Sequence, residues 1–371
     1  MSQIIRSGCC MKVGIMLPSY ARWFRGDAIW AVCEKAKEIG LDSLCFFDHV
    51  IFTPKQYVGY GNGYMDCWTA MAYVAAVTNV QGWKPILTNS VVVIPYRPPI
   101  QQGKVIATVD SLSGGRVMVG AGSGYNENEF ASLGLNVKER GDMTDEYLAC
   151  MKELWTHPVS SFHGKYANFD EMTVSVRPTT QPYPPVLYGS HGARPRRRVA
   201  ERYQGVIQGP GRNLESQHTF DSDMTDLTKL WKEHGRIGKP YIMAGIGGHI
   251  TTDRSQVGQD VVKGVTPDVV PAVGIGTSGR VEAGQERAYV STFRLIHVDT
   301  MIEDVRRADA GGVDMAIFNL PSYRFGGLDN QSLQLQQMEV FAEHVMPKIP
   351  RDKKPIEMDF DGKKATPFAK A

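Results

Sequence analysis

Eight short apolar runs alternate with eight segments of helical period, and this alternation constrains the fold of the chain more than any other feature. The predicted strands are residues 12–18, 41–47, 86–94, 116–121, 186–188, 205–208, 241–250 and 313–319. Strands that are joined through a helix pair in parallel. Eight such units predict an α/β fold, a (β/α)8 TIM barrel with insertions, although a doubly wound sheet fits the alternation nearly as well.

A single barrel domain accounts for most of the 371 residues. We assign residues 12–349 to the barrel, residues 1–11 to an N-terminal extension and residues 350–371 to a C-terminal tail. Residues 251–295 are rich in glycine and proline, which indicates an insertion that forms a lid or an oligomer contact. Because the tail is polar and contains proline, we expect it to be disordered or to wrap a neighbouring subunit. Alternation within residues 160–177 predicts an inserted hairpin.

The composition is that of a soluble globular protein, with 42% hydrophobic and 22% charged residues. A formal net charge of +2 gives no reason to expect a nucleic acid or an acidic membrane as a partner. No run of about 18 apolar residues is present, so we predict neither a signal peptide nor a membrane span. The six cysteines form no CxxC pair, which favours reduced thiols, no bound metal and a cytoplasmic location.

Polar and small residues gather where three of the predicted strands end. His49 follows the second strand, and Asn89 and Ser90 interrupt the third. The run GAGSGYNENEF follows the fourth strand, and its loop residues are Gly122, Ser123, Gly124 and Tyr125. Because ligands bind at the carboxyl ends of parallel strands, we predict that these residues form one binding site. A tight turn is the alternative interpretation of each feature taken alone.

A neutral imidazole can accept or donate a proton near neutral pH, which makes His49 a candidate catalytic residue. A histidine with a structural role is the alternative. Asp48 could orient the ring or cap the loop, because adjacent residues on a strand point to opposite sides.

An anion-binding loop is predicted after the fifth strand, where Gly189, Ser190 and His191 precede a helix. Backbone N–H groups at a helix N-terminus attract phosphate, and arginine adds a charged donor that can make two hydrogen bonds. The helix carries Arg194, Arg196, Arg197 and Arg198. Successive helix residues are about 100° apart, so a solvated helix face is the better interpretation for at least two of these arginines.

Other motifs give little support for a different chemistry. The run GIGTSG at residues 274–279 fits the dinucleotide fingerprint, with Asp299 about 20 residues further on. No convincing apolar helix follows it, so we interpret it as a loop. The chain has no Walker sequence, no HExxH and no GxSxG, which leaves hydrolase and kinase functions unsupported.

Four phrases, in this order, resemble the luciferase-like family of flavin- and deazaflavin-dependent oxidoreductases. They are the strand end at residues 89–91, ATVDSLSGGR at 107–116, GAGSGYNENEFASLG at 120–134 and ERGDMTDEYLACMKELW at 139–155. The family uses a (β/α)8 barrel, so the resemblance favours the barrel over the doubly wound sheet.

The resemblance also implies roles for the candidate residues. It places His49 beside the reactive edge of the flavin, with Asn89, Ser90 and the 122–125 loop against the ring. It places the cofactor phosphate at the loop that begins with Gly189. Ser190, His191 and Arg198 are the further candidates there.

The resemblance implies an enzyme, and three functions stay open. The first is a monooxygenase that uses O2 and reduced FMN, delivered by a separate flavin reductase, on a small organic substrate. The second is an F420-dependent oxidoreductase that transfers hydride without oxygen, although Tyr125 stands where sugar-phosphate-type members carry an acidic residue. The third is a non-catalytic flavin-binding relative. The arginines and the tail resemble those of alkanesulfonate monooxygenases, a resemblance that favours FMN and an anionic or polar substrate. We further expect a homodimer or homotetramer.

Overall fold

The computed structural model describes residues 11–17, 26–53, 64–189, 192–209, 214–258, 295–320, 330–351 and 354–368. The first ten residues, most of the predicted insertion and the GIGTSG run lie outside these stretches. Ser190 and His191 also lie outside them.

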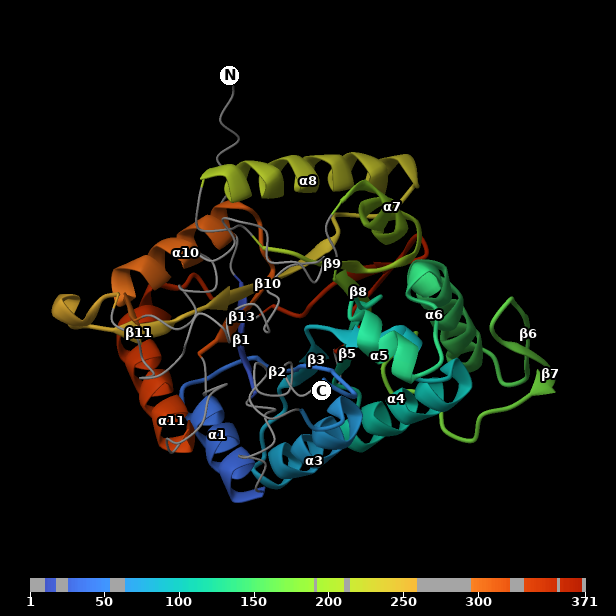
Figure 1. Cartoon of the computed structure of the whole chain (residues 1–371), viewed down its shortest axis with the longest axis horizontal. Helices are drawn as coiled ribbons and strands as arrows, with labels where there is room; N and C mark the ends of the chain where they lie inside the picture. Colours follow the sequence, from blue (N-terminus) through green and yellow to red (C-terminus); the bar gives the residue numbers. More distant parts are fainter. Residues whose placement is uncertain are drawn as a thin grey trace.

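A closed ring of parallel strands forms the centre of the molecule (Figure 1). Its strands are β1 (Lys12–Met16), β2 (Ser43–Phe46), β3 (Ile86–Asn89), β5 (Val117–Gly122), β8 (Val186–Gly189), β9 (Gly205–Ile207), β10 (Tyr241–Gly247) and β13 (Met315–Asn319). Each strand pairs in parallel with the next in this order, and β13 pairs with β1. A doubly wound sheet would leave its outer strands unpaired, so this closure confirms the predicted (β/α)8 barrel.

A helix follows each barrel strand and packs on the outside of the ring (Figure 1). These helices are α1 (Gly26–Glu38), α3 (Cys67–Val80), α4 (Pro99–Ser113), α6 (Arg140–Thr156), α7 (Ala193–Arg202), α8 (Leu214–Glu233), α10 (Val298–Ala310) and α11 (Asn330–Val340). In α1 the buried residues Ile29, Val32, Cys33 and Ala36 recur at helical spacing, so one face of the helix covers the strands.

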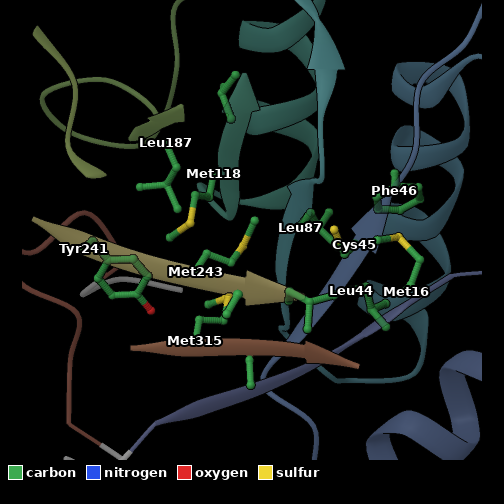
Figure 2. Close-up of a cluster of buried hydrophobic side chains, with 14 of the residues drawn as sticks. Met16, Leu44, Cys45, Phe46, Leu87, Met118, Leu187, Tyr241, Met243 and Met315 are labelled. Carbon is green, nitrogen blue, oxygen red and sulfur yellow. The ribbon is translucent and has the colours of Figure 1, made fainter. Parts of the chain in front are cut away.

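Large apolar side chains fill the inside of the barrel away from the strand ends. Strand register places Met118, Leu187, Met243 and Met315 on the inward face, and all four are fully buried. Figure 2 shows these side chains converging from four strands. The barrel is therefore a packed core, and a ligand can enter only where the strands end.

The third predicted strand is split into two pieces. β3 ends at Asn89, the Ser90–Val91 peptide bond is cis, and the short strand β4 (Val92–Val93) follows. β4 still pairs with β5 at its carboxyl end. The interruption that Asn89 and Ser90 predict is therefore present.

The segments beside the barrel include the predicted hairpin and both ends of the predicted insertion. β6 (Ser160–His163) and β7 (Asn168–Met172) form the antiparallel hairpin expected within residues 160–177. β11 (His249–Thr251) pairs in parallel with β12 (Leu295–His297), so the two ends of the insertion lie together.

The C-terminal tail packs on its own chain. β14 (Met358–Phe360) and β15 (Lys363–Ala365) form a small hairpin, and Ile356, Met358 and Phe360 are buried. The expectation of disorder is therefore wrong for residues 354–368. The reason is that three apolar residues at every second position bury one face of a segment whose average composition is polar. A contact of the tail with a neighbouring subunit stays a prediction.

The cysteines of the described stretches are free and buried: Cys33, Cys45, Cys67 and Cys150. Burial raises the pKa of Cys33 and of Cys150 to about 12, which keeps both thiols protonated and unreactive. None of the helices in the described part of the chain combines the length and the apolarity of a membrane span.

Candidate active site

Four strand ends bring the predicted residues to one mouth of the barrel. All barrel strands run parallel, so their carboxyl ends open on the same side. His49 follows β2, Ser90 follows β3, Tyr125 follows β5 and Gly189 ends β8. The rings of His49 and Tyr125 have centroids 6.1 Å apart and meet edge-on. Residues far apart in the sequence therefore border one region.

Glu129 is the residue of this region that the sequence analysis missed. It lies in the short helix α5 (Glu127–Ser132), which begins after the cap residue Asn126. Its side chain is fully buried, and Oε2 lies 2.8 Å from Nδ1 of His49. Oε2 also accepts a hydrogen bond from the hydroxyl of Tyr96 at 3.0 Å, and Oε1 accepts one from the N–H of Val50 at 2.8 Å.

These hydrogen bonds keep Glu129 ionised. Burial raises the pKa of its carboxyl group. The hydrogen bond and charge of His49, together with the hydrogen bonds from Val50 and Tyr96, lower the pKa by more than this. The net pKa lies below the ordinary value of glutamate. Burial, together with Glu129 itself, raises the pKa of Tyr96, so Tyr96 stays a neutral donor.

Asp48 fixes the backbone and does not orient His49. Its carboxylate makes two bonds of 2.8 Å with Arg97 and accepts the N–H of Val93 at 3.0 Å. Arg97 also pairs with Asp66, which caps the N-terminus of α3, at 2.7 Å. This network joins the ends of β2 and β4 to α3. Of the two alternatives, the structure supports a loop-fixing role for Asp48.

Aromatic rings surround His49. Its ring centroid lies 5.1 Å from that of Phe52 and 5.4 Å from that of Tyr64. Phe47 meets Tyr64 edge-on at 5.8 Å. These contacts make the surroundings of the imidazole largely apolar.

Glycines occupy the inward positions of the strand ends. A Cβ atom at Gly120 would overlap the carbonyl oxygen of Asn89, and one at Gly189 would lie 2.5 Å from Val91. A Cβ at Gly122 would also overlap Val91. Gly245 differs, because none of the described residues lies within 4 Å of an added Cβ and the residue is exposed in the middle of a barrel strand. The described part of the chain therefore leaves space above β10.

Asn89 and Ser123 have different surroundings. Asn89 is fully buried, and neither its amide oxygen nor its amide nitrogen has a hydrogen-bond partner among the described residues. A buried amide without partners is rare in native proteins. Strand register places Thr88, in line with Met118, on the inward face, so the side chain of Asn89 lies on the opposite face of β3. Ser123, in contrast, lies beside the phenol of Tyr188: burial raises the pKa of Tyr188, and the hydroxyl of Ser123 partly lowers it.

Arg196, Arg197 and Arg198 of α7 pair with acidic residues, two of them with residues of neighbouring helices. Arg198 bonds Asp145 at 2.7 Å and Asp142 at 3.0 Å, both in α6. Arg196 pairs with Asp223 of α8. Arg197 is mostly exposed and bonds Glu201, as expected for a solvated helix face. Because two carboxylates already balance its charge, Arg198 is better explained as a link between α6 and α7 than as a phosphate ligand.

A comparison with known protein families shows to which family the chain belongs. Residues 11–308 match the model of the luciferase-like monooxygenase family. The chain belongs to the luciferase-like monooxygenase family. This confirms the resemblance that the four phrases carried.

Three relatives of this luciferase-like protein show the range of the family. An uncharacterised protein of Mycobacterium tuberculosis is 33% identical over 181 residues, which is 48% of this chain and 61% of that protein, less than two thirds of its length. The FMNH2-dependent dimethylsulfone monooxygenase of Pseudomonas putida is 29% identical over 325 residues, 82% of this chain and 84% of that one. The F420-dependent glucose-6-phosphate dehydrogenase of Amycolatopsis mediterranei is 32% identical over 187 residues, 49% of this chain and 53% of that one.

A solved structure shows the same fold. A monooxygenase of Streptomyces bottropensis superposes on the luciferase-like chain with a TM-score of 0.72 at 19% identity. The match covers 91% of this chain and 99% of that one.

Proposed function

We propose that this luciferase-like protein is a flavin-dependent oxidoreductase, and specifically a monooxygenase that uses reduced FMN and O2 on a small organic substrate. The observation that carries the proposal is the His49–Glu129 pair at the mouth of the barrel, beside the glycine-rich 122–125 loop. Similarity to the FMNH2-dependent dimethylsulfone monooxygenase over 82% of the chain supports FMN as the cofactor.

The described residues fit a flavin at the strand ends. The inward position of Gly245 has no described residue within 4 Å of an added Cβ, which leaves room for a planar group. When bound, reduced FMN would supply the redox chemistry. Ser90 and the 122–125 loop would hold its ring, and the loop of Gly189, Ser190 and His191 at the start of α7 would hold its phosphate.

Residues of the protein would then transfer a proton and exclude water. His49 would take up or deliver a proton at the substrate, while Phe52 and Tyr64 limit the access of water to the imidazole. The arginines of α7 no longer favour an anionic substrate, because Arg196 and Arg198 are already paired with aspartates.

The alternative function is F420-dependent hydride transfer. Similarity to the F420-dependent glucose-6-phosphate dehydrogenase supports it, but that match covers only 49% of the chain. A non-catalytic flavin-binding relative is the third candidate. The hydrogen bond that orients His49 argues against it, because a protein without catalysis does not need an oriented imidazole. A separate flavin reductase, a homodimer or homotetramer and a cytoplasmic location belong to the first proposal.

Cofactor titrations distinguish these functions. Reduced FMN and reduced F420 are titrated anaerobically into the purified protein, and binding is followed by absorbance and by the shift in thermal midpoint. Binding of FMN with O2-dependent turnover in the presence of NADH and a flavin reductase supports the monooxygenase. Selective binding of F420 would replace it with the alternative, and FMN binding without turnover of any substrate would favour the third candidate.

Replacement of His49 tests its catalytic role. We expect His49→Ala to lower kcat/KM by about 100-fold or more, the usual contribution of a general acid or base, with little change in the thermal midpoint. His157→Ala, at an exposed histidine that follows α6, is the matched control and should change neither. Equal losses of stability and turnover in His49→Ala would mean that the histidine is structural.

A further inference from the structure

The two carboxylate oxygens of Glu129 bond different parts of the protein. Oε1 accepts the N–H of Val50 at 2.8 Å and lies 3.4 Å from the N–H of Ile51. Oε2 bonds Nδ1 of His49 at 2.8 Å and the hydroxyl of Tyr96 at 3.0 Å. The backbone bonds thus fix which oxygen faces the imidazole.

An ionised carboxylate can only accept hydrogen bonds. Nδ1 of His49 must therefore carry a hydrogen, and the neutral ring has its lone pair on Nε2. In imidazole the two nitrogens lie on opposite sides of the ring, so Nε2 points away from Glu129.

We propose that Glu129 is the positioning residue of His49: it selects the Nδ1–H tautomer, so that Nε2 is the atom that exchanges a proton at the barrel mouth. The inference rests on the proposed function, because it says how the histidine of that site is prepared. A proton taken by Nε2 turns the ring into an imidazolium, whose charge the adjacent carboxylate balances. Release of the proton from Nε2 restores the same tautomer.

Other ionisable groups near the pair do not replace Glu129. Asp48 faces this region, but its charge is balanced by Arg97 at 2.8 Å. Tyr96, Tyr64 and Tyr125 contribute phenol groups, and burial raises the pKa of Tyr96. Glu129 is therefore the carboxylate that bonds the imidazole directly.

Glu129→Gln gives a sharp test, because Val50 fixes the orientation of the new amide. The N–H of Val50 requires an acceptor, so the amide oxygen of glutamine should take the place of Oε1. The amide NH2 then faces Nδ1 of His49 and needs an acceptor there. We expect the ring to invert to the Nε2–H tautomer.

The measurement is nitrogen NMR of protein labelled with 15N-histidine, at a pH well above the ordinary titration range of histidine. Protonated and unprotonated ring nitrogens have distinct shifts, and His49→Gln identifies His49 among the nine histidines. Wild type should show a protonated Nδ1, and Glu129→Gln a protonated Nε2. Glu127→Gln, an exposed position two residues earlier in α5, is the matched control and should keep the wild-type tautomer.

Two outcomes would overturn the inference: a protonated Nε2 in wild type, or the same tautomer in wild type and in folded Glu129→Gln. If Glu129→Gln does not fold, the wild-type spectrum still decides. Titration of wild type and Glu129→Gln with reduced FMN is a separate arm. If wild type does not bind reduced FMN, the proposed function is refuted. A protonated Nδ1 in wild type and a protonated Nε2 in Glu129→Gln would then still support the positioning role of Glu129.

Discussion

Two glycines of the barrel strands differ in the space that is available for a side chain. Gly120 and Gly245 both lie on inward positions of barrel strands. A Cβ at Gly120 would overlap the carbonyl of Asn89, whereas no described residue lies within 4 Å of a Cβ at Gly245. One methyl group should therefore affect stability at the first site and cofactor binding at the second.

We expect Gly120→Ala to be destabilised by about 3 kcal/mol or more, because the Asn89–Val91 turn must move to admit the Cβ. Gly245→Ala should keep the wild-type free energy of unfolding but bind reduced FMN more weakly. Urea unfolding and anaerobic FMN titration measure the two effects. Unchanged FMN affinity in Gly245→Ala would place the cofactor away from β10.

At this scale the sequence predicts the positions of residues better than their contacts. His49, Tyr125 and Gly189 were expected at the barrel mouth, where they lie. Glu129 was missed. The available signal was its place next to an apolar residue, Phe130, in a short helix after the glycine-rich loop, where both side chains are buried. The bond between Glu129 and His49 joins residues 80 positions apart, and no local pattern encodes such a contact.

The C-terminal hairpin is an element whose role only its contacts reveal. The carboxylate of Asp359 pairs with Arg236, and both side chains are almost fully buried. Asp359 also accepts the N–H of Ile237 at 2.9 Å, while Arg236 donates to the carbonyl of Tyr203 at 2.9 Å. Arg236 precedes β10 and Phe360 packs on Tyr183, which precedes β8, so the hairpin covers the end of the barrel opposite His49.

Removal of the Asp359 charge should therefore destabilise the packing of the hairpin on this end of the barrel. We expect Asp359→Asn to lower the free energy of unfolding by about 3–5 kcal/mol, because it leaves the Arg236 guanidinium buried without its counter-charge. Asp361→Asn, in the same hairpin and half-exposed, is the control and should cost less than about 1 kcal/mol. Similar losses in the two variants, measured by urea unfolding, would contradict this role.

Strands and helices were predicted well because their periods are local. All eight barrel strands lie at the predicted apolar runs, and the hairpin lies within residues 160–177. The predicted seventh strand, 241–250, extends beyond β10 into β11, which pairs with β12 in a separate sheet. The split of the third strand followed from Asn89 and Ser90. The tail hairpin was missed because its three apolar residues are separated by polar ones and become a buried face only against Tyr183 and Arg236.

The stability of the whole molecule should depend on pH through the ionisation of the buried Glu129. The folded state holds the proton of Glu129 less tightly than the unfolded chain does, since its pKa is lowered. Glu129 therefore stabilises the fold above the ordinary glutamate pKa of about 4.5, and this contribution is lost as the pH falls through the lowered value.

Comparison of wild type with Glu129→Gln isolates this effect from other titrating groups. At neutral pH we expect the variant to be less stable by about 1–3 kcal/mol, the cost of disturbing hydrogen bonds to a buried charged group. The difference should shrink as the pH falls below about 4. Urea unfolding at a series of pH values measures it, and a gap that stays constant would mean that Glu129 is not ionised in the fold.

The sequence by itself determined the alternation of strands and helices and the strand ends at which small and polar residues gather. These follow from local periodicity and from the rule that parallel strands end on one side. The alternation left a doubly wound sheet open; the resemblance to the luciferase-like family favoured the barrel, and the pairing of β13 with β1 closes it. Only the tertiary structure decided which side chains pair: His49 with Glu129, Asp48 with Arg97, and Asp359 with Arg236. The physical reason is that a buried charge must find a partner wherever packing brings one, and the chain order does not specify that place.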